Sequence, residues 1–273
     1  MLHRQLRAAL AGLALVLAAV ACSPARSPSS PLAVTGDART PPAPAAAASA
    51  SPDEPFEADA SPSASAGPLG VLGRVDAADF VVAVDNPWFP LRPGTVWTYT
   101  GVKTAKQAIE VITVLAEPTV IDGVPCVARQ DDLTLNQVRV ERSVTYYAQH
   151  RDGGVWLFGE DSHQVDRKGN IRGVEGSWRA GVDGAQPDLV MPPAPAKGNE
   201  FDEHTAELHV TVLSIEETVE VPQGTHQSTV LMEEADPNEP GLLAHKYYVR
   251  DIGMVRDVSV GGPLEELKLQ SIQ

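Results

Sequence analysis

The amino-acid sequence predicts an all-β domain whose antiparallel strands form two tandem repeats of about five strands each. Short runs of β-branched and aromatic residues alternate with Gly, Pro and Asp turn signals along most of the chain. The strand pattern recurs in the second half of the chain. No segment of normal length shows amphipathic helical spacing, and short helical turns fit only 75–80 and 160–200. About ten strands can form a barrel, a curved sheet or a sandwich.

The expected strands differ in their burial patterns. Residues 96–100 alternate, with Trp97 and Tyr99 on one face. Residues 108–115 are apolar on both faces, which predicts a central strand. Residues 133–140 change their apolar parity midway, which predicts a bulge or bend. Further strands are expected over 124–129, 144–149, 155–158 and 265–272, the last with its leucines inward.

Three matches in the same order indicate an internal duplication. They join 111–115 to 209–213, 119–120 to 218–219, and the tyrosine pair 146–147 to 247–248. The β domain, 71–273, therefore divides into repeat one (93–160), a central loop (161–196), repeat two (197–260) and a final strand (265–272). The alternative to a duplication is that short β-branched segments recur by chance. The central segment is long for a structureless connection, so we expect a local hairpin or a functional loop there.

The N-terminus has the pattern of an export signal. His3, Arg4 and Arg7 precede an apolar run over 8–21, which is shorter than the about 20 residues of a membrane-spanning helix. Small residues then lead directly to Cys22. In this pattern the chain resembles bacterial lipoproteins. The resemblance implies that 1–21 is a signal peptide and that Cys22 carries acyl chains; a plain secretory signal is the alternative.

A tether is expected between the lipidated cysteine and the β domain. Residues 22–70 are rich in Ser, Pro and Ala and contain almost no bulky apolar side chain. Such a segment cannot bury enough surface to offset the entropy of ordering, so the sequence predicts disorder. Its prolines favour a semi-extended spacer that holds the folded part away from the membrane.

The charge balance excludes one class of partner. The chain of 273 residues has a formal net charge of −15. Loss of Arg4 and Arg7 with the signal leaves 19 basic residues against 36 acidic ones, a net charge of −17. Nucleic-acid binding requires a basic surface, so it is not expected. Contact with the membrane is expected through the N-terminal lipid and not through the protein surface.

Sequence signals of catalysis or of a bound cofactor are absent. The chain has no G-x-S-x-G, P-loop, dinucleotide or H-E-x-x-H motif. We therefore predict no catalytic residue, no metal site and no cofactor. A hydrolase built from Asp183, Asp188 and a histidine is a weaker alternative. Cys126 lies in an apolar run and is expected to be a buried small hydrophobe and not a catalytic thiol.

Aromatic residues outside the expected strands are the candidate ligand contacts. Trp88 and Phe89 lie between prolines just before the first strand, and repeat two has no counterpart for them. Trp178 and Met191 lie in the central segment. Aromatic side chains supply much of the contact area in ligand pockets as well as in cores. The sequence predicts that Trp88, Phe89, Trp178 and Met191 line a ligand site.

Two motifs carry a further resemblance. The chain has FPLxPGTxWxY over 89–99 and GSWxAGVDGA over 176–185. In these motifs the chain resembles a group of exported β-rich bacterial proteins. The resemblance implies export but no activity and no functional residue.

The sequence thus favours a protein anchored by lipid to the bacterial cell envelope, at the outer membrane or the outer face of the plasma membrane. Its β domain is expected to be non-catalytic and to bind a small ligand, with an apolar molecule as one option, or a partner protein. A structural or protein-interaction module is the alternative. Several hundred cubic ångströms of cavity beneath Trp88 and Trp178 would favour the ligand.

Overall fold

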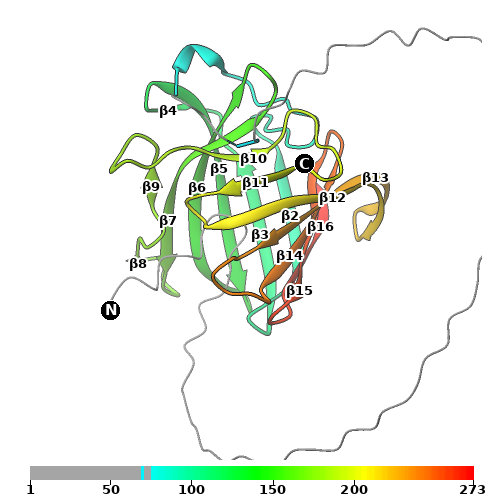
Figure 1. The fold of residues 1–273 in the computed structure, drawn as a ribbon. Helices are drawn as coiled ribbons and strands as arrows, with labels where there is room; N and C mark the ends of the chain where they lie inside the picture. Colours follow the sequence, from blue (N-terminus) through cyan, green and yellow to red (C-terminus); the bar gives the residue numbers. More distant parts are fainter. Residues whose placement is uncertain (1–68, 71–74) are drawn as a thin grey trace, which may run out of the picture. The chain divides into compact units, whose positions relative to one another are not determined.

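The computed structural model describes residues 69–70 and 75–273 (Figure 1). The predicted signal peptide, the lipidated Cys22 and nearly all of the predicted tether lie outside the described residues. Within them the chain forms one antiparallel sheet of 16 strands and a single 3-10 turn, η1 (Ala77–Asp79). The prediction of an all-β antiparallel fold is confirmed. No helix in this part of the chain has the length and apolarity needed to span a membrane.

The strands follow one another with short connections. They are β1 (Phe80–Val81), β2 (Val96–Lys103), β3 (Lys106–Val114), β4 (Thr119–Ile121), β5 (Val124–Leu135), β6 (Val138–His150), β7 (Val155–Val165), β8 (Ile171–Gly173), β9 (Trp178–Arg179), β10 (Asp188–Met191), β11 (Glu200–Glu203), β12 (Leu208–Val221), β13 (Gly224–Ala235), β14 (Leu243–Val249), β15 (Gly253–Gly261) and β16 (Glu266–Ile272).

The final strand joins two meanders into one sheet. The order is β10-β7-β6-β5-β3-β2-β16-β15-β14-β13-β12-β11, so β16 lies between the first strand of one half and the last strand of the other. Short strands pair beside this path: β1 with β6, β4 with β5, and β8 and β9 with β7. Every pairing is antiparallel, as expected for strands linked by hairpins and tight turns.

The sheet curves until its two end strands, β10 and β11, lie side by side (Figure 1). They do not pair as strands, so the sheet is not closed into a barrel. Asp188 on β10 instead bonds to the chain directly after β11. Its carboxylate accepts the backbone N–H groups of His204 at 2.8 Å and Thr205 at 3.1 Å. A side chain therefore supplies the contact that a strand ladder supplies elsewhere.

The two halves share the turn that leads into their first strands. The Gly94 N–H donates to the Val114 carbonyl at 2.9 Å, and the Gly198 N–H donates to the Val212 carbonyl at 2.8 Å. Both glycines have positive φ, 87° and 85°, a conformation that favours Gly. The hydrogen bonds of the two glycines therefore correspond.

The tyrosine pairs share a second detail. A register shift between Tyr146 and Tyr147 interrupts the pairing of β6 with β7. A shift between Tyr247 and Tyr248 interrupts the pairing of β14 with β15. A β-bulge increases local twist and re-aims the side chains beside it. The shared bulge agrees with a duplication, which stays a prediction until 93–160 and 197–260 are superposed.

One expected strand is in fact two. A bulge is predicted within 133–140, and the pairing of β5 with β6 does shift register between Leu133 and Thr134. The single strand expected there is wrong, because β5 ends at Leu135 and β6 begins at Val138. Asn136 and Gln137 form the intervening two-residue turn with φ of 46° and 66°. Paired positive φ values are typical of the hairpin turn that matches strand twist. The parity change marked this turn, but the turn contains no glycine to signal it.

The core confirms the predicted inward faces of several strands. Trp97 and Tyr99 on β2 are buried, as are Leu267 and Leu269 on β16. Cys126 is fully buried, and burial raises the pKa of its thiol to about 12. It is therefore an unreactive core residue at neutral pH.

Candidate functional site: a charged cavity

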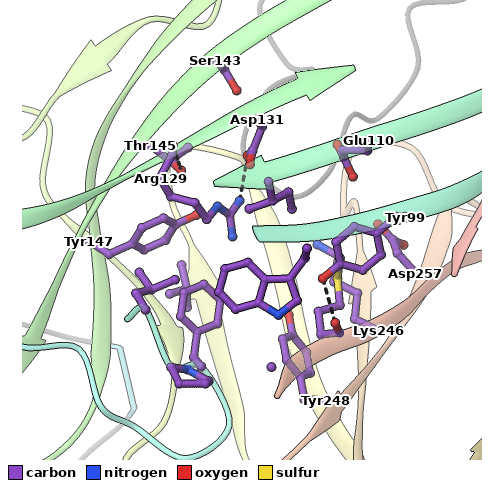
Figure 2. A pocket seen from close by; sticks show the side chains of 18 of the residues that line it. Tyr99, Glu110, Arg129, Asp131, Ser143, Thr145, Tyr147, Lys246, Tyr248 and Asp257 are labelled. Atoms are coloured by element: carbon purple, nitrogen blue, oxygen red, sulfur yellow. Dashed lines mark hydrogen bonds and ion pairs between the residues drawn. The ribbon is translucent and has the colours of Figure 1, made fainter. Parts of the chain in front are cut away.

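The curved sheet encloses a cavity of about 110 Å³, lined by strands of both halves (Figure 2). It is smaller than the several hundred cubic ångströms expected beneath Trp88 and Trp178, and neither tryptophan lines it. The volume has room for ordered water or a very small ligand. Its wall carries six carboxyl groups and two basic groups. They are Glu110, Asp131, Glu141, Glu203, Glu234 and Asp257, with Arg129 and Lys246. Charged groups are seldom buried without partners, so this interior differs from an ordinary apolar core.

Arg129 and Asp131 form the ion pair of the first half. Both lie on β5, and Arg129 Nη2 donates to Asp131 Oδ2 at 2.9 Å. The guanidinium also lies 5.0 Å from the centre of the Tyr147 ring, within the range of a cation–π contact. Burial raises the pKa of Asp131 to about 6, although Arg129 acts in the opposite direction.

Lys246 and Glu234 form the ion pair of the second half. Lys246 Nζ on β14 donates to Glu234 Oε1 on β13 at 2.6 Å, and the two side chains are only 6% and 7% exposed. Burial acts against the ammonium charge, but Glu234 and Asp257 raise the pKa of Lys246 above its ordinary value. The lysine is therefore charged at neutral pH.

The two acids of these pairs occupy corresponding positions. Val127 pairs with Tyr147 and Val230 pairs with Tyr248, where each tyrosine is the second of its pair. Asp131 and Glu234 each lie four residues beyond the valine of their own half. The basic partners differ, because the first half supplies its base from β5 and the second from β14. The two halves thus place their paired acids at corresponding positions of the cavity wall, but not their paired bases.

The other carboxyl groups of the wall have no hydrogen bond from the described residues. Glu110, Glu203 and Asp257 are 8%, 5% and 8% exposed. Burial, with Glu234 as a second cause, raises the pKa of Glu203 well above its ordinary value. Burial also raises the pKa of Glu141 to about 7, against the opposing effect of Lys103. Burial therefore favours the protonated form of Glu203 and Glu141.

Lys103 is the third basic group of the interior. It is 2% exposed, and its Nζ has no hydrogen-bond partner among the described residues. Its charge lowers the pKa values of Glu141 and Asp257, although burial raises both by more. One buried lysine outside the cavity wall therefore acts on the charge of several acids.

Aromatic rings complete the wall, and two of them are fixed by backbone carbonyls. Trp97 Nε1 donates to the Ile252 carbonyl at 3.0 Å, and the Tyr99 hydroxyl donates to the Met254 carbonyl at 2.8 Å. These bonds attach β2 to the start of β15 across the sheet. Because their polar atoms are occupied, both side chains offer aromatic surface to the cavity.

The segment before β2 closes part of the cavity. The buried Asn86 fixes it: Asn86 Nδ2 donates to the carbonyls of Gly153 at 2.9 Å and Pro192 at 3.1 Å, and its Oδ1 accepts the Trp88 N–H at 2.9 Å. Phe89 follows and enters the cavity wall with its ring 5.1 Å from that of Tyr147. One asparagine thus holds this segment against two loops.

The four predicted ligand contacts do not lie together. Phe89 lines the cavity. Trp88 instead packs beneath Arg250, whose guanidinium lies 5.3 Å from the indole centre. Trp178 lies on β9, and Met191 is fully buried on β10. Neither is part of the cavity wall.

The charged residues of the wall did not emerge from the sequence as a site. Their signal was present, because Glu110 lies on the same strand face as the buried Ala108 and Ile112. A carboxylate in an otherwise apolar strand face predicts an inward charge. Which inward charges face one another depends on the pairing of distant strands, and one strand alone does not show that.

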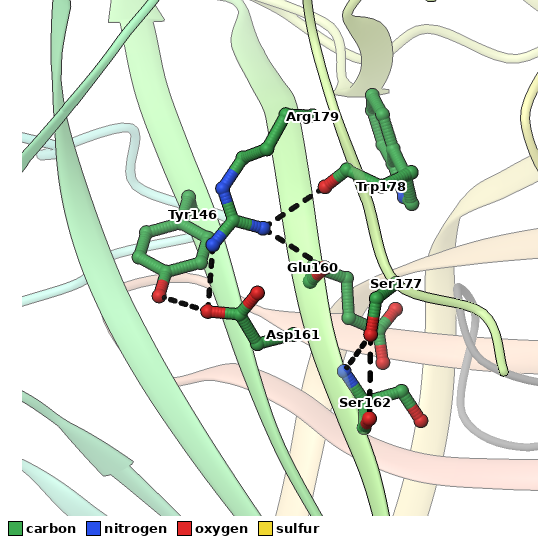
Figure 3. A network of polar contacts seen from close by, with 7 residues as sticks. All are labelled: Tyr146, Glu160, Asp161, Ser162, Ser177, Trp178 and Arg179. Atoms are coloured by element: carbon green, nitrogen blue, oxygen red, sulfur yellow. Dashed lines mark hydrogen bonds and ion pairs between the residues drawn. The ribbon is translucent and has the colours of Figure 1, made fainter. Parts of the chain in front are cut away.

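A second polar network lies around β7 and β9 (Figure 3). Arg179 Nη2 donates to Asp161 Oδ2 at 2.6 Å, and the Tyr146 hydroxyl donates to the same oxygen at 2.8 Å. Arg179 Nη1 also donates to the Glu160 carbonyl at 2.9 Å. Burial opposes ionisation of Asp161, but Arg179 and Tyr146 hold its pKa below the ordinary value. This network fastens β9 to the sheet and engages the guanidinium of Arg179, the carboxylate of Asp161 and the hydroxyl of Tyr146.

The residues of the weaker hydrolase alternative are apart. Asp183 is exposed in the turn before β10, whereas the buried Asp188 accepts two backbone N–H groups at the seam of the sheet. Among the described residues no three His, Cys, Asp or Glu side chains are arranged to hold a metal ion.

Comparisons with known proteins give distant structural similarity alone. No family model matches the chain, and no curated protein matches it. Solved structures with some similarity include an exported protein of Bacteroides fragilis described as having a YmcC-like fold and a lipoprotein of Parabacteroides distasonis. Both are 15% identical to this chain, with TM-scores of 0.37 and 0.39. The matches cover 68% and 69% of this chain, and 98% and 99% of those chains. Similarity at this level implies neither a family nor an activity.

Proposed function

We propose that this protein is exported, anchored to the bacterial cell envelope through lipid on Cys22, and binds a small ligand in the cavity of its curved sheet. The observation that carries the proposal is the cavity wall itself. Charged groups from both halves meet there around aromatic rings, where an ordinary sheet would pack an apolar core.

The wall favours a polar ligand over an apolar one. Ionised or hydrogen-bonding groups are costly to bury, and a binding site retains them because they are satisfied in the complex. Here several carboxyl groups lack a protein partner within the described residues, although they are almost fully buried. A purely apolar guest would leave them unsatisfied.

In this proposal the lipid anchor holds the cavity-bearing domain at the cell envelope. The signal pattern places the protein outside the plasma membrane, and the expected tether gives the binding domain reach from the surface. The chain has a formal net charge of −15, so we expect its surface to attract anionic lipid little and attachment to depend on Cys22.

The proposal is tested by purifying the Cys22→Ser chain under mild conditions and identifying the small molecules released on denaturation by mass spectrometry. We expect one compound in a constant molar ratio to protein. The variant Thr145→Leu narrows the cavity and should lose it, because Thr145 lies in the wall and is 3% exposed. Thr218→Leu is the matched control on an exposed site of β12 and should retain it.

If neither the Cys22→Ser chain nor its Thr218→Leu variant releases a compound, ligand binding is overturned. Equal amounts from Thr145→Leu and Thr218→Leu would place the ligand elsewhere. For the anchor, Cys22→Ser should move the protein from the membrane fraction to the soluble fraction. Unchanged membrane retention would contradict lipidation at this residue.

A further inference from the structure

The strongest unexplained feature of the cavity is its unequal charge. The wall has six carboxyl groups against two basic groups. Asp131 and Glu234 are paired with Arg129 and Lys246. The other four have no hydrogen bond from the described residues, and the charge of the buried Lys103, which is not part of the wall, acts on two of them, Glu141 and Asp257. Carboxyl groups therefore outnumber the cations that could neutralise them.

Three of these four groups are more than nine-tenths buried while lining the cavity: Glu110, Glu203 and Asp257. They come from β3, β11 and β15, so they surround the cavity from different parts of the sheet. Buried carboxylates are stabilised by a nearby cation with hydrogen-bond donors. What the site lacks is a positive group, and the fold leaves room for one to enter.

The rings of the wall suit an organic cation. Trp97, Tyr99 and Tyr248 line the cavity together with the acids. Trp97 and Tyr99 use their polar atoms on backbone carbonyls, so they offer π surface to a guest. Trp and Tyr rings attract ammonium groups within about 6 Å of the ring centre. A hydrated metal ion would use neither ring, and the acids lie outside any metal-binding arrangement among the described residues.

We infer that the ligand is a small organic ammonium compound, whose positive nitrogen is held by Glu110 and Asp257 and whose carbon skeleton lies against Trp97 and Tyr99. This inference rests on the proposed function and specifies its ligand class. It needs no bond to form or break, because the site selects by charge and shape.

The test compares three probes of nearly equal shape: n-butylammonium, 1-butanol and butyrate. Each is titrated calorimetrically into the Cys22→Ser chain at pH 7.5 in phosphate, because amine buffers would themselves occupy the site. Protein stripped of co-purified ligand by refolding is used for all three. Butylammonium should bind about ten-fold or more tightly than butanol, in line with a charge-assisted hydrogen bond. Butyrate should not bind.

Glu110→Gln tests the wall directly, since it removes one charge and keeps the shape. It should weaken butylammonium binding by about ten-fold or more. The same change relieves repulsion among buried acids, so its thermal midpoint should equal or exceed that of the Cys22→Ser parent. Loss of binding with retained stability separates a ligand contact from a structural role. Glu220→Gln, at an exposed acid on β12, is the matched control and should bind as the parent does.

Equal or tighter binding of butanol or butyrate would overturn the inference, and so would unchanged binding by Glu110→Gln. Failure of all three probes to bind would overturn it as well. In each case a compound that co-purifies with the chain and is lost in Thr145→Leu would leave the proposed function standing. Absence of any such compound would overturn both the inferred ligand class and the proposed function.

Discussion

Lys246 and Glu234 show how this protein tolerates charge in its interior. The two side chains are almost completely buried and joined at 2.6 Å. Removing two charges from water is costly, and their attraction offsets this only when the geometry is good. Replacing one partner leaves a buried charge without compensation, whereas replacing both with apolar groups can be neutral. The pair is therefore more sensitive to single than to double substitution.

Lys246→Met should lower the free energy of unfolding by about 3–5 kcal/mol, because Glu234 then lies unpaired beside Glu203. Denaturant unfolding followed by tryptophan fluorescence measures this. The double variant Lys246→Met/Glu234→Leu should recover most of the loss. A single variant of parental stability, or a double variant no better than the single, would contradict the assigned pairing.

Glu160 gives the ligand-free protein an unusual dependence on pH. Burial, and then the carboxylates of Asp131 and Glu141, raise its pKa from 4.5 to about 9. Between these values the native state keeps a proton that the unfolded chain has released. Stability is therefore highest near the lower value and decreases as pH rises, by about 1.4 kcal/mol per pH unit for one such group.

The free energy of unfolding should consequently fall by about 2–3 kcal/mol between pH 6 and pH 8, with a further contribution from Glu141 up to its pKa of about 7. Carboxylates with lowered pKa values, such as Asp161 and Glu266, are ionised in both states throughout this interval. Urea unfolding at several pH values measures the slope. Glu160→Gln should make the slope shallower, and Glu220→Gln should leave it unchanged. If the stability of the parent protein is constant or rises from pH 6 to pH 8, the raised pKa of Glu160 is excluded.

At the scale of elements, the segment before β2 lies outside the predicted repeat and helps to form the cavity. It is held by Asn86, which is 2% exposed and makes three hydrogen bonds to backbone groups through its side chain. Those bonds reach the β6–β7 turn at Gly153 and the chain after β10 at Pro192. The segment is therefore a fixed closure and not a mobile flap.

Asn86→Ala should lower the free energy of unfolding by about 2–4 kcal/mol, because it leaves two carbonyls and one N–H without their partner. It should also release Phe89 from the cavity wall and weaken retention of the co-purified ligand. Asn238→Ala, at an exposed turn, is the control and should cost less than about 1 kcal/mol. Denaturant unfolding and the ligand ratio measure the two effects, and parental values for both in Asn86→Ala would contradict the role of this residue.

Local sequence was enough to predict most strands but not the site. The β-branched run over 108–115 identified β3 because its preference is strong at every position. The turn at Asn136 and Gln137 was missed because neither residue is the glycine that usually accompanies positive φ. Phe89 was found by its place outside the repeat. Arg129 and Lys246 were not, because their approach depends on how distant strands pair around the whole sheet.

At the scale of the molecule, the curved sheet has an open seam at its ends and a charged inner face. Its ends meet at Asp188 without strand pairing, and its inner face holds charges contributed by both halves. A closed apolar core would be more stable, so the charged interior fits the proposed binding role better than a purely structural role. The expected lipid and tether would place this binding domain at the cell envelope.

We propose that the cavity between the two ion pairs holds a ligand. A crystal structure of the Cys22→Ser chain, purified without denaturation, tests it most directly. We predict continuous non-protein electron density in the cavity, in contact with Tyr99 and Tyr248 and absent from the Thr145→Leu variant. A cavity that contains only separate water peaks, or that is filled by the side chains of its own wall, would contradict the account.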